Sequence, residues 1–140
     1  MSSTDFVASD NRLIMRNTMT AAVVTLALNL ALYFIGDAAG WIPDELPERA
    51  EQFGLPALIL STVVPILIGG VVLVILVHTT NHPVLMFCLI ASVAFIATLV
   101  APLSIAGAST AFRTFLVSLH LVTVVVGTAL LVRNVADEPE

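Results

Sequence analysis

The chain has 140 residues, of which 59% are apolar and 11% are charged, and its formal net charge is -5 at pH 7. A soluble protein carries roughly 25% charged residues, so this composition excludes an ordinary water-soluble domain. The acidic balance, without a basic stripe, also argues against a nucleic-acid partner. The single cysteine, Cys88, has no second cysteine with which to form an internal disulfide.

Four apolar stretches are long enough to cross a bilayer, because about 20 helical residues span a hydrocarbon core of about 30 Å. They cover about residues 17–36, 56–77, 84–104 and 111–132. None contains Asp, Glu or Lys, and Arg113 lies near an end of the fourth. Helices around a water-soluble core would instead carry charged outer faces. We therefore predict an all-α integral membrane protein, an antiparallel four-helix bundle.

The remaining segments define the predicted organisation. Residues 1–16 form a polar amino-terminal tail, 17–133 the four-span membrane domain with an external loop over 37–55, and 134–140 an acidic carboxy-terminal tail. A cleaved signal peptide is the alternative for the first span. Its apolar run exceeds the usual signal core of roughly 7 to 15 residues, which favours a retained span.

The basic residues set the predicted orientation. Arg12, Arg16 and Arg133 lie on one side of the spans, and Arg49 and Arg113 lie on the other. Because cytoplasmic loops carry an excess of Lys and Arg, we expect a multi-pass protein of the cell membrane with both termini cytoplasmic.

The external loop contains one possible secondary-structure element. Leu46, Ala50 and Phe53 follow one another at spacings of four and three, which predicts a short amphipathic helix on the membrane surface, capped by Asp44. An irregular acidic loop is the alternative.

Polar residues inside the spans mark the faces that point into the bundle, where they can find partners. On the first span a stripe at helical spacing contains Thr18, Ala22, Thr25, Asn29, Tyr33 and Gly36. On the fourth span the corresponding stripe contains Arg113, Leu116, His120, Thr123 and Gly127. His120 thus shares an inward face with other polar residues.

Depth along the membrane normal suggests that these residues form one polar layer. At about 1.5 Å per residue, Asn29, Thr62, Thr98 and His120 all lie within about 7 Å of the midplane on the loop side. Pro65 adds an acceptor there, because a proline inside a helix leaves the carbonyl of Ser61 without its usual donor. We predict a hydrogen-bonded cluster that contains Asn29, the Ser61 carbonyl, Thr62, Thr98 and His120.

This polar layer has two interpretations. It holds the helices in register, or it forms a small polar cavity that binds a solute, a lipid headgroup or a proton. The spans contain no acid, so a proton relay would lack its usual partner. Pro102 and Ser104 at the end of the third span mark a helix terminus or, alternatively, the rim of such a cavity.

The histidines do not predict a metal site. His78 and His82 are four residues apart, but Pro83 disfavours helical geometry at His82. His120 lies roughly 15 to 20 Å away along the membrane normal, so no third ligand is available. The chain also lacks phosphate-loop and nucleophile motifs, so we predict no metal, no cofactor and no catalytic residue.

Three short segments carry a family resemblance: "NLALYFIG" in the first span, "LVAPLSIAG" at the end of the third and "VSLHLV" in the fourth. In order and spacing they resemble a family of small four-span prokaryotic membrane proteins known only as a domain of unknown function. The resemblance covers about residues 12–133. It implies that Asn29, Pro102, Ser104 and His120 are the recurring positions, with Thr98 in place of a serine and Leu119 in place of a methionine.

The family resemblance brings no activity, so function is inferred from the residues. We favour a non-enzymatic accessory or interaction subunit, a homo-oligomer or the partner of another membrane protein, with the acidic loop offered to that partner. The alternative is a small-solute or lipid binder or transporter. Its candidate ligand-binding residues are Asn29, Thr62, Thr98, Ser104 and His120, and Pro65 and Pro102 have structural roles.

Overall fold

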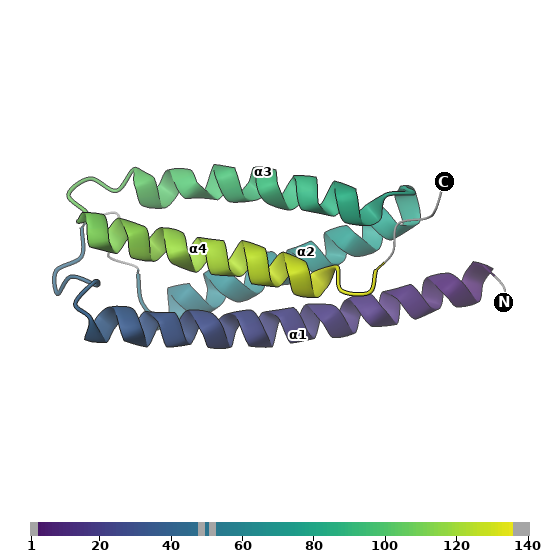
Figure 1. The fold of residues 1–140 in the computed structure, drawn as a ribbon, viewed down its shortest axis with the longest axis horizontal. Coiled ribbons are helices and arrows are strands. Elements are labelled where there is room, and N and C mark those ends of the chain that lie inside the picture. Colours follow the sequence, from purple (N-terminus) through teal and green to yellow (C-terminus); the bar gives the residue numbers. More distant parts are fainter. Residues whose placement is uncertain (1–2, 48–49, 51–52, 136–140) are drawn as a thin grey trace.

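A computed structural model describes residues 3–47, 50 and 53–135, with backbone alone for residues 3–10. The chain forms four α-helices: α1 (Ser3–Ala38), α2 (Leu55–Thr79), α3 (Pro83–Leu103) and α4 (Thr110–Leu131). Successive helices run in opposite directions (Figure 1), and no strand occurs among the described residues. All four helices are long and apolar enough to cross a membrane. The predicted all-α four-helix bundle is confirmed.

Helix α1 is longer than the first predicted span. It begins at Ser3, so the backbone of residues 3–16, predicted as a separate polar tail, continues the first span as helix. Its 36 residues measure about 54 Å at the standard helical rise, more than the hydrocarbon core. Its amino-terminal turns project beyond the other helices (Figure 1). The limits of α2, α3 and α4 agree closely with the predicted spans.

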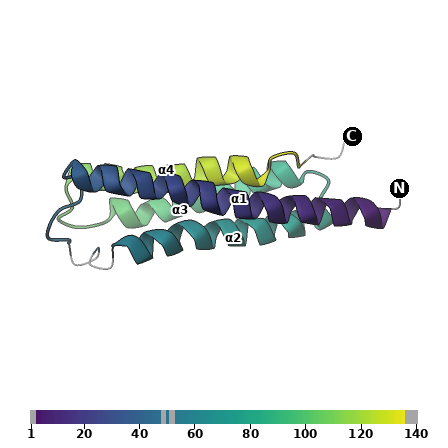
Figure 2. The same ribbon diagram turned by 90° about the horizontal axis from the view of Figure 1, so that it is seen from below.

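The bundle has two ends, which we name by what they carry. The long-loop end carries the described residues of 39–54 and the turn at 104–109, and the terminal end carries the start of α1, the end of α4 and the turn at 80–82 (Figures 1 and 2). Helix α2 meets α3 at the terminal end and diverges from it toward the long-loop end (Figure 1). This divergence creates the space that contains the candidate site.

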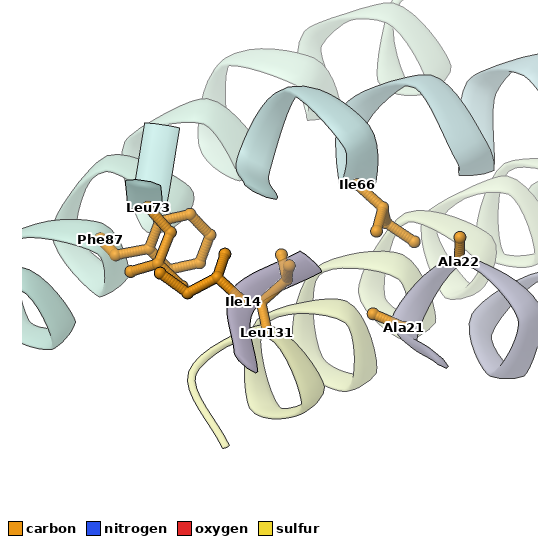
Figure 3. Packing of buried hydrophobic residues seen from close by; sticks show 7 residues of the cluster. All are labelled: Ile14, Ala21, Ala22, Ile66, Leu73, Phe87 and Leu131. Carbon is orange, nitrogen blue, oxygen red and sulfur yellow. The ribbon is translucent and has the colours of Figure 1, made fainter. Parts of the chain in front are cut away.

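Buried apolar residues form two clusters. Figure 3 shows the first, in which all four helices meet around Ile14, Ala21, Ala22, Ile66, Leu73, Phe87 and Leu131. The second lies at the long-loop end and contains Ala50, Leu58, Ile105, Phe112, Phe115, Leu116 and Leu119. The two clusters anchor opposite ends of the bundle.

The long loop packs onto the second cluster, and those of its residues that the structure describes do not form the predicted surface helix. Leu46, Ala50 and Phe53 all contact this cluster, and the Phe53 ring lies 5.5 Å from that of Phe112. The described loop residues form bends and one 3₁₀ position at Ala50, while part of the predicted helix, 48–49 and 51–52, lies outside the described residues. The regularly spaced apolar residues of the loop pack against the end of the bundle.

Helix α1 packs closely against α2 at Gly70. A Cβ at this position would overlap the side chain of Thr18, whose Cγ2 would lie only 2.8 Å away. Thr18 is held in this rotamer because its hydroxyl donates to the carbonyl of Ile14 at 2.8 Å. A small residue at a helix contact lets two backbones pack closely in a membrane.

Candidate membrane-facing cavity

A cavity of about 860 Å³ lies between α2, α3 and α4. Most of its lining is apolar, and its exposed lining residues include Pro65 and Ile68 on α2 and Ile90 and Ala94 on α3. These residues lie inside the two apolar spans, so the cavity opens sideways toward the bilayer. Its volume falls in the range of small-molecule sites, about 300–1,000 Å³.

Asn29 of α1 forms the polar floor of this cavity. Its side chain is 1% exposed, and its amide nitrogen donates to the hydroxyl oxygen of Thr62 at 2.9 Å and to that of Thr123 at 2.8 Å. The Thr123 hydroxyl in turn donates to the carbonyl of Leu119 at 2.9 Å. One amide group thereby connects α1 with α2 and α4.

The other half of the Asn29 amide is unpaired. Its Oδ1 is buried and has no hydrogen-bond partner. The Thr123 proton is used on the Leu119 carbonyl, and the amide orientation in which the nitrogen donates to both threonine hydroxyls leaves Oδ1 as the unpaired atom. An unpaired buried acceptor costs about 1–3 kcal/mol, so a molecule that donates a hydrogen bond here would be stabilised.

His120 of α4 supplies a second acceptor to the cavity lining. Its Nδ1 lies 2.9 Å from the carbonyl oxygen of Leu116. Because a carbonyl only accepts, Nδ1 carries the proton, and in the neutral ring Nε2 is left as an acceptor. The residue is half-buried and lines the cavity.

The remaining polar candidates line the same cavity but do not join the Asn29 cluster. The hydroxyl of Thr98 donates to the Phe95 carbonyl at 2.8 Å, and that of Ser104 donates to the Ala101 carbonyl at 3.1 Å. With their protons used locally, both side chains offer only oxygen lone pairs. The predicted five-membered cluster is therefore wrong in extent, since among its members only Asn29 and Thr62 bond to each other.

Thr123 takes the place of the missing members. The sequence put it on the same helical face as His120, three residues away, yet it was not among the candidate site residues. Its hydroxyl is the acceptor that completes the Asn29 cluster. The helical spacing was the signal that could have identified it.

Pro65 and Pro102, which were predicted to have structural roles, both line the cavity. Pro65 is inside the uninterrupted helix α2, and Pro102 is buried in the last turn of α3, which ends at Leu103. Pro102 and Ser104 were predicted to form either a helix terminus or the rim of a cavity. They lie at the end of α3 and also line the cavity.

His120 is the one ionisable side chain among the described residues that line the cavity. None of the described residues that line the cavity is Asp, Glu, Lys or Arg. No group of three or more His, Cys, Asp or Glu among the described residues is placed to hold a metal ion. His78, away from the cavity, places Nδ1 at 2.7 Å from the carbonyl oxygen of Val74 in its own helix.

A comparison with protein-family models matches residues 9–137 to a family of unknown function, DUF6069. This confirms the resemblance found in the sequence. No curated protein and no solved structure matches the chain.

Proposed function

The chain belongs to DUF6069, a family of unknown function, so we propose a role from the geometry alone: it is a non-enzymatic membrane protein that binds a neutral amphipathic molecule inside the bilayer. The single observation that carries the proposal is that Asn29, whose Oδ1 is buried and unpaired, belongs to the lining of an apolar cavity.

The polar groups define the class of molecule. The unpaired oxygen of Asn29 and the Nε2 of His120 are both acceptors, so the matching ligand donates hydrogen bonds. The described lining carries no cation to pair with a carboxylate or phosphate. A long apolar body that ends in a hydroxyl group, such as a fatty or isoprenoid alcohol, satisfies both requirements.

Photolabelling tests this proposal. The protein is placed in lipid nanodiscs with a long-chain alcohol that carries a diazirine on its chain, and labelled peptides are mapped by mass spectrometry. We expect labelling of the residues around the cavity mouth. The corresponding carboxylate and the alkane without a hydroxyl should label several-fold less.

Two variants and one control make the test specific. Asn29→Leu removes the polar floor at similar volume, and Ala94→Trp fills the mouth without changing a polar group; both should abolish labelling by the alcohol. Thr25→Val is the matched control, because Thr25 is also on α1, is 0% exposed, has an unpaired hydroxyl and does not line the cavity. Equal labelling by alcohol and alkane, or loss in the Thr25 variant alone, would contradict the proposal.

The accessory-subunit role is the second candidate. Helix α3 favours it, because Leu89, Val93, Ile96 and Val100 present an apolar row that is 54–68% exposed and that a second membrane protein or another copy of this chain can cover. Native mass spectrometry of gently extracted protein tests it, since a partner or a defined oligomer adds a discrete mass. A purely monomeric protein would remove this candidate.

We propose in addition that the protein lies in the cell membrane with the terminal end in the cytoplasm. Arg12, Arg16 and Arg133 all lie toward this end, which supports that orientation. The test is a cysteine introduced at Asp44 in the Cys88→Ala background. It should react with an impermeant maleimide in intact cells, and protection until the cells are opened would reverse the orientation.

A further inference from the structure

A second, smaller pocket lies at the terminal end between α1 and the segment that follows α4. Its volume is about 270 Å³, and it is lined by Arg16, Asn17, Thr20, Leu130, Arg133 and Asn134. No acidic side chain occurs among its described lining residues. The pocket thus brings together basic residues that are more than a hundred positions apart in the sequence.

Asn17 builds this pocket. Its side chain is 5% exposed, and its amide nitrogen donates to the carbonyl of Leu131 at 3.1 Å and to that of Arg133 at 2.7 Å. The Leu131 carbonyl is the last of α4 and the Arg133 carbonyl follows just beyond it, and unpaired oxygens at a helix carboxy-terminus make the surroundings negative. By pairing them, Asn17 fixes the segment of Arg133 against α1 and removes two acceptors that would repel an anion.

The chain direction after α4 depends on Asn134. Its φ angle is 60°, a left-handed conformation that asparagine tolerates better than most residues. The turn is closed by a hydrogen bond from the amide of Val135 to the carbonyl of Val132 at 3.0 Å. Arg133, which lies in this turn, and Arg16 of α1 both line the pocket.

We propose that this pocket binds a phosphate group, that of an anionic phospholipid headgroup at the terminal face of the membrane. Guanidinium groups match phosphate oxygens in pairs of hydrogen bonds. Arg16 directly precedes the apolar run at 17–36, and Arg133 follows the span that ends at Leu131, so both lie near the depth of lipid phosphates. Val23 and Val24 are exposed about one helical turn beyond Thr20 toward the bilayer centre, where acyl chains would contact them.

The site is separate from the neutral cavity, with which it shares no lining residue. The test uses nanodiscs of phosphatidylcholine with a minor fraction of phosphatidylglycerol. The lipids that stay bound after release from the disc are counted by native mass spectrometry. Phosphatidylglycerol should be retained in preference to phosphatidylcholine, whereas equal retention of the two lipids would overturn the proposal.

Variants that each remove one positive charge distinguish binding in this pocket from attraction by the general surface charge. Arg16→Gln and Arg133→Gln should each weaken retention of phosphatidylglycerol about fivefold, the equivalent of about 1 kcal/mol per basic residue near a membrane surface. Arg12→Gln is the control, because Arg12 is exposed on α1 one turn away and does not line the pocket. An equal loss in the Arg12 variant would overturn the proposal.

Two further arms identify the source of the phosphate and check the fold. Arg133→Lys keeps the charge but not the paired hydrogen bonds, so its loss should be intermediate. If millimolar inorganic phosphate displaces the lipid, the pocket binds phosphate but its ligand is a soluble phosphate, and the assignment to a lipid headgroup is overturned. Thermal unfolding followed by circular dichroism should be unchanged in all these variants, which shows that the bundle remains folded whether or not the neutral cavity binds an alcohol.

Discussion

Helices α1, α2 and α4 are joined by polar contacts and close backbone approach, whereas α3 contributes apolar contacts and leaves most of its surface exposed. Asn29 of α1 forms hydrogen bonds with α2 and α4, and Gly70 allows α1 and α2 to pack closely. On α3, Val93 and Ile96 are 68% and 67% exposed. Lipid chains are as apolar as these side chains, so an apolar contact holds a membrane helix weakly. Helices α1, α2 and α4 thus form a hydrogen-bonded unit, and α3 forms a fourth wall that packs on it through apolar side chains.

Two adjacent glycines test this difference, because one faces Thr18 of α1 and the other faces the side chains of Leu131 on α4 and Phe87 on α3. Gly70→Ala should destabilise the protein by about 2 kcal/mol, since its Cβ overlaps Thr18. At Gly69 the Cβ would lie 3.1 Å from Leu131 Cδ1 and 3.4 Å from Phe87 Cζ, which are side-chain ends that can shift. Gly69→Ala should therefore cost less than about 1 kcal/mol.

Thermal unfolding in detergent, followed by circular dichroism, measures both effects. Adding Thr18→Ala to Gly70→Ala removes the overlapping atoms and should restore most of the lost stability. If both glycine variants unfold at the same temperature, the helices pack equally closely around Gly69 and Gly70, which would contradict the expected difference.

The polar connection is expected to contribute less than the close backbone contact. Asn29→Leu removes two interhelical hydrogen bonds, each worth about 0.6 kcal/mol in membrane proteins, and should cost about 1 kcal/mol. Thr25→Val should be neutral or slightly stabilising, because the hydroxyl that it removes is buried without a partner. The same unfolding assay applies, and a Thr25 variant less stable than the Asn29 variant would contradict this assignment.

The smallest effects should come from the outer face of α3. Val93→Ala and Ile96→Ala should each change stability by less than about 0.5 kcal/mol in the monomer, since lipid contacts are exchanged for lipid contacts. A loss above 1 kcal/mol would mean that this face is packed against another protein. The measurement thus also bears on the accessory-subunit candidate.

The four helices were predictable because the bilayer imposes a length and a composition that a single stretch of sequence reveals. Asn29, Thr62 and His120 were recognisable as inward-facing because a polar side chain at membrane depth needs a partner. The helical backbone before Asn17 was not predicted, since those residues are polar and continue a helix that the apolar span has already nucleated.

Other features depend on contacts that no local pattern contains. Leu46, Ala50 and Phe53 had the spacing of a surface helix, but a buried aromatic cluster at the end of the bundle was available to them. Thr98 and Ser104 face the cavity yet bond within their own segments. The cavity itself arises from the divergence of α2 and α3, which depends on how whole helices pack.

The sideways opening of the cavity has a consequence for how occupancy is measured. If the cavity binds an amphipathic molecule as proposed, that molecule enters between α2 and α3 from the hydrocarbon phase. Saturation then follows the mole fraction of the molecule among the lipids. Diluting the sample with buffer should leave the bound fraction unchanged, while adding empty vesicles should lower it.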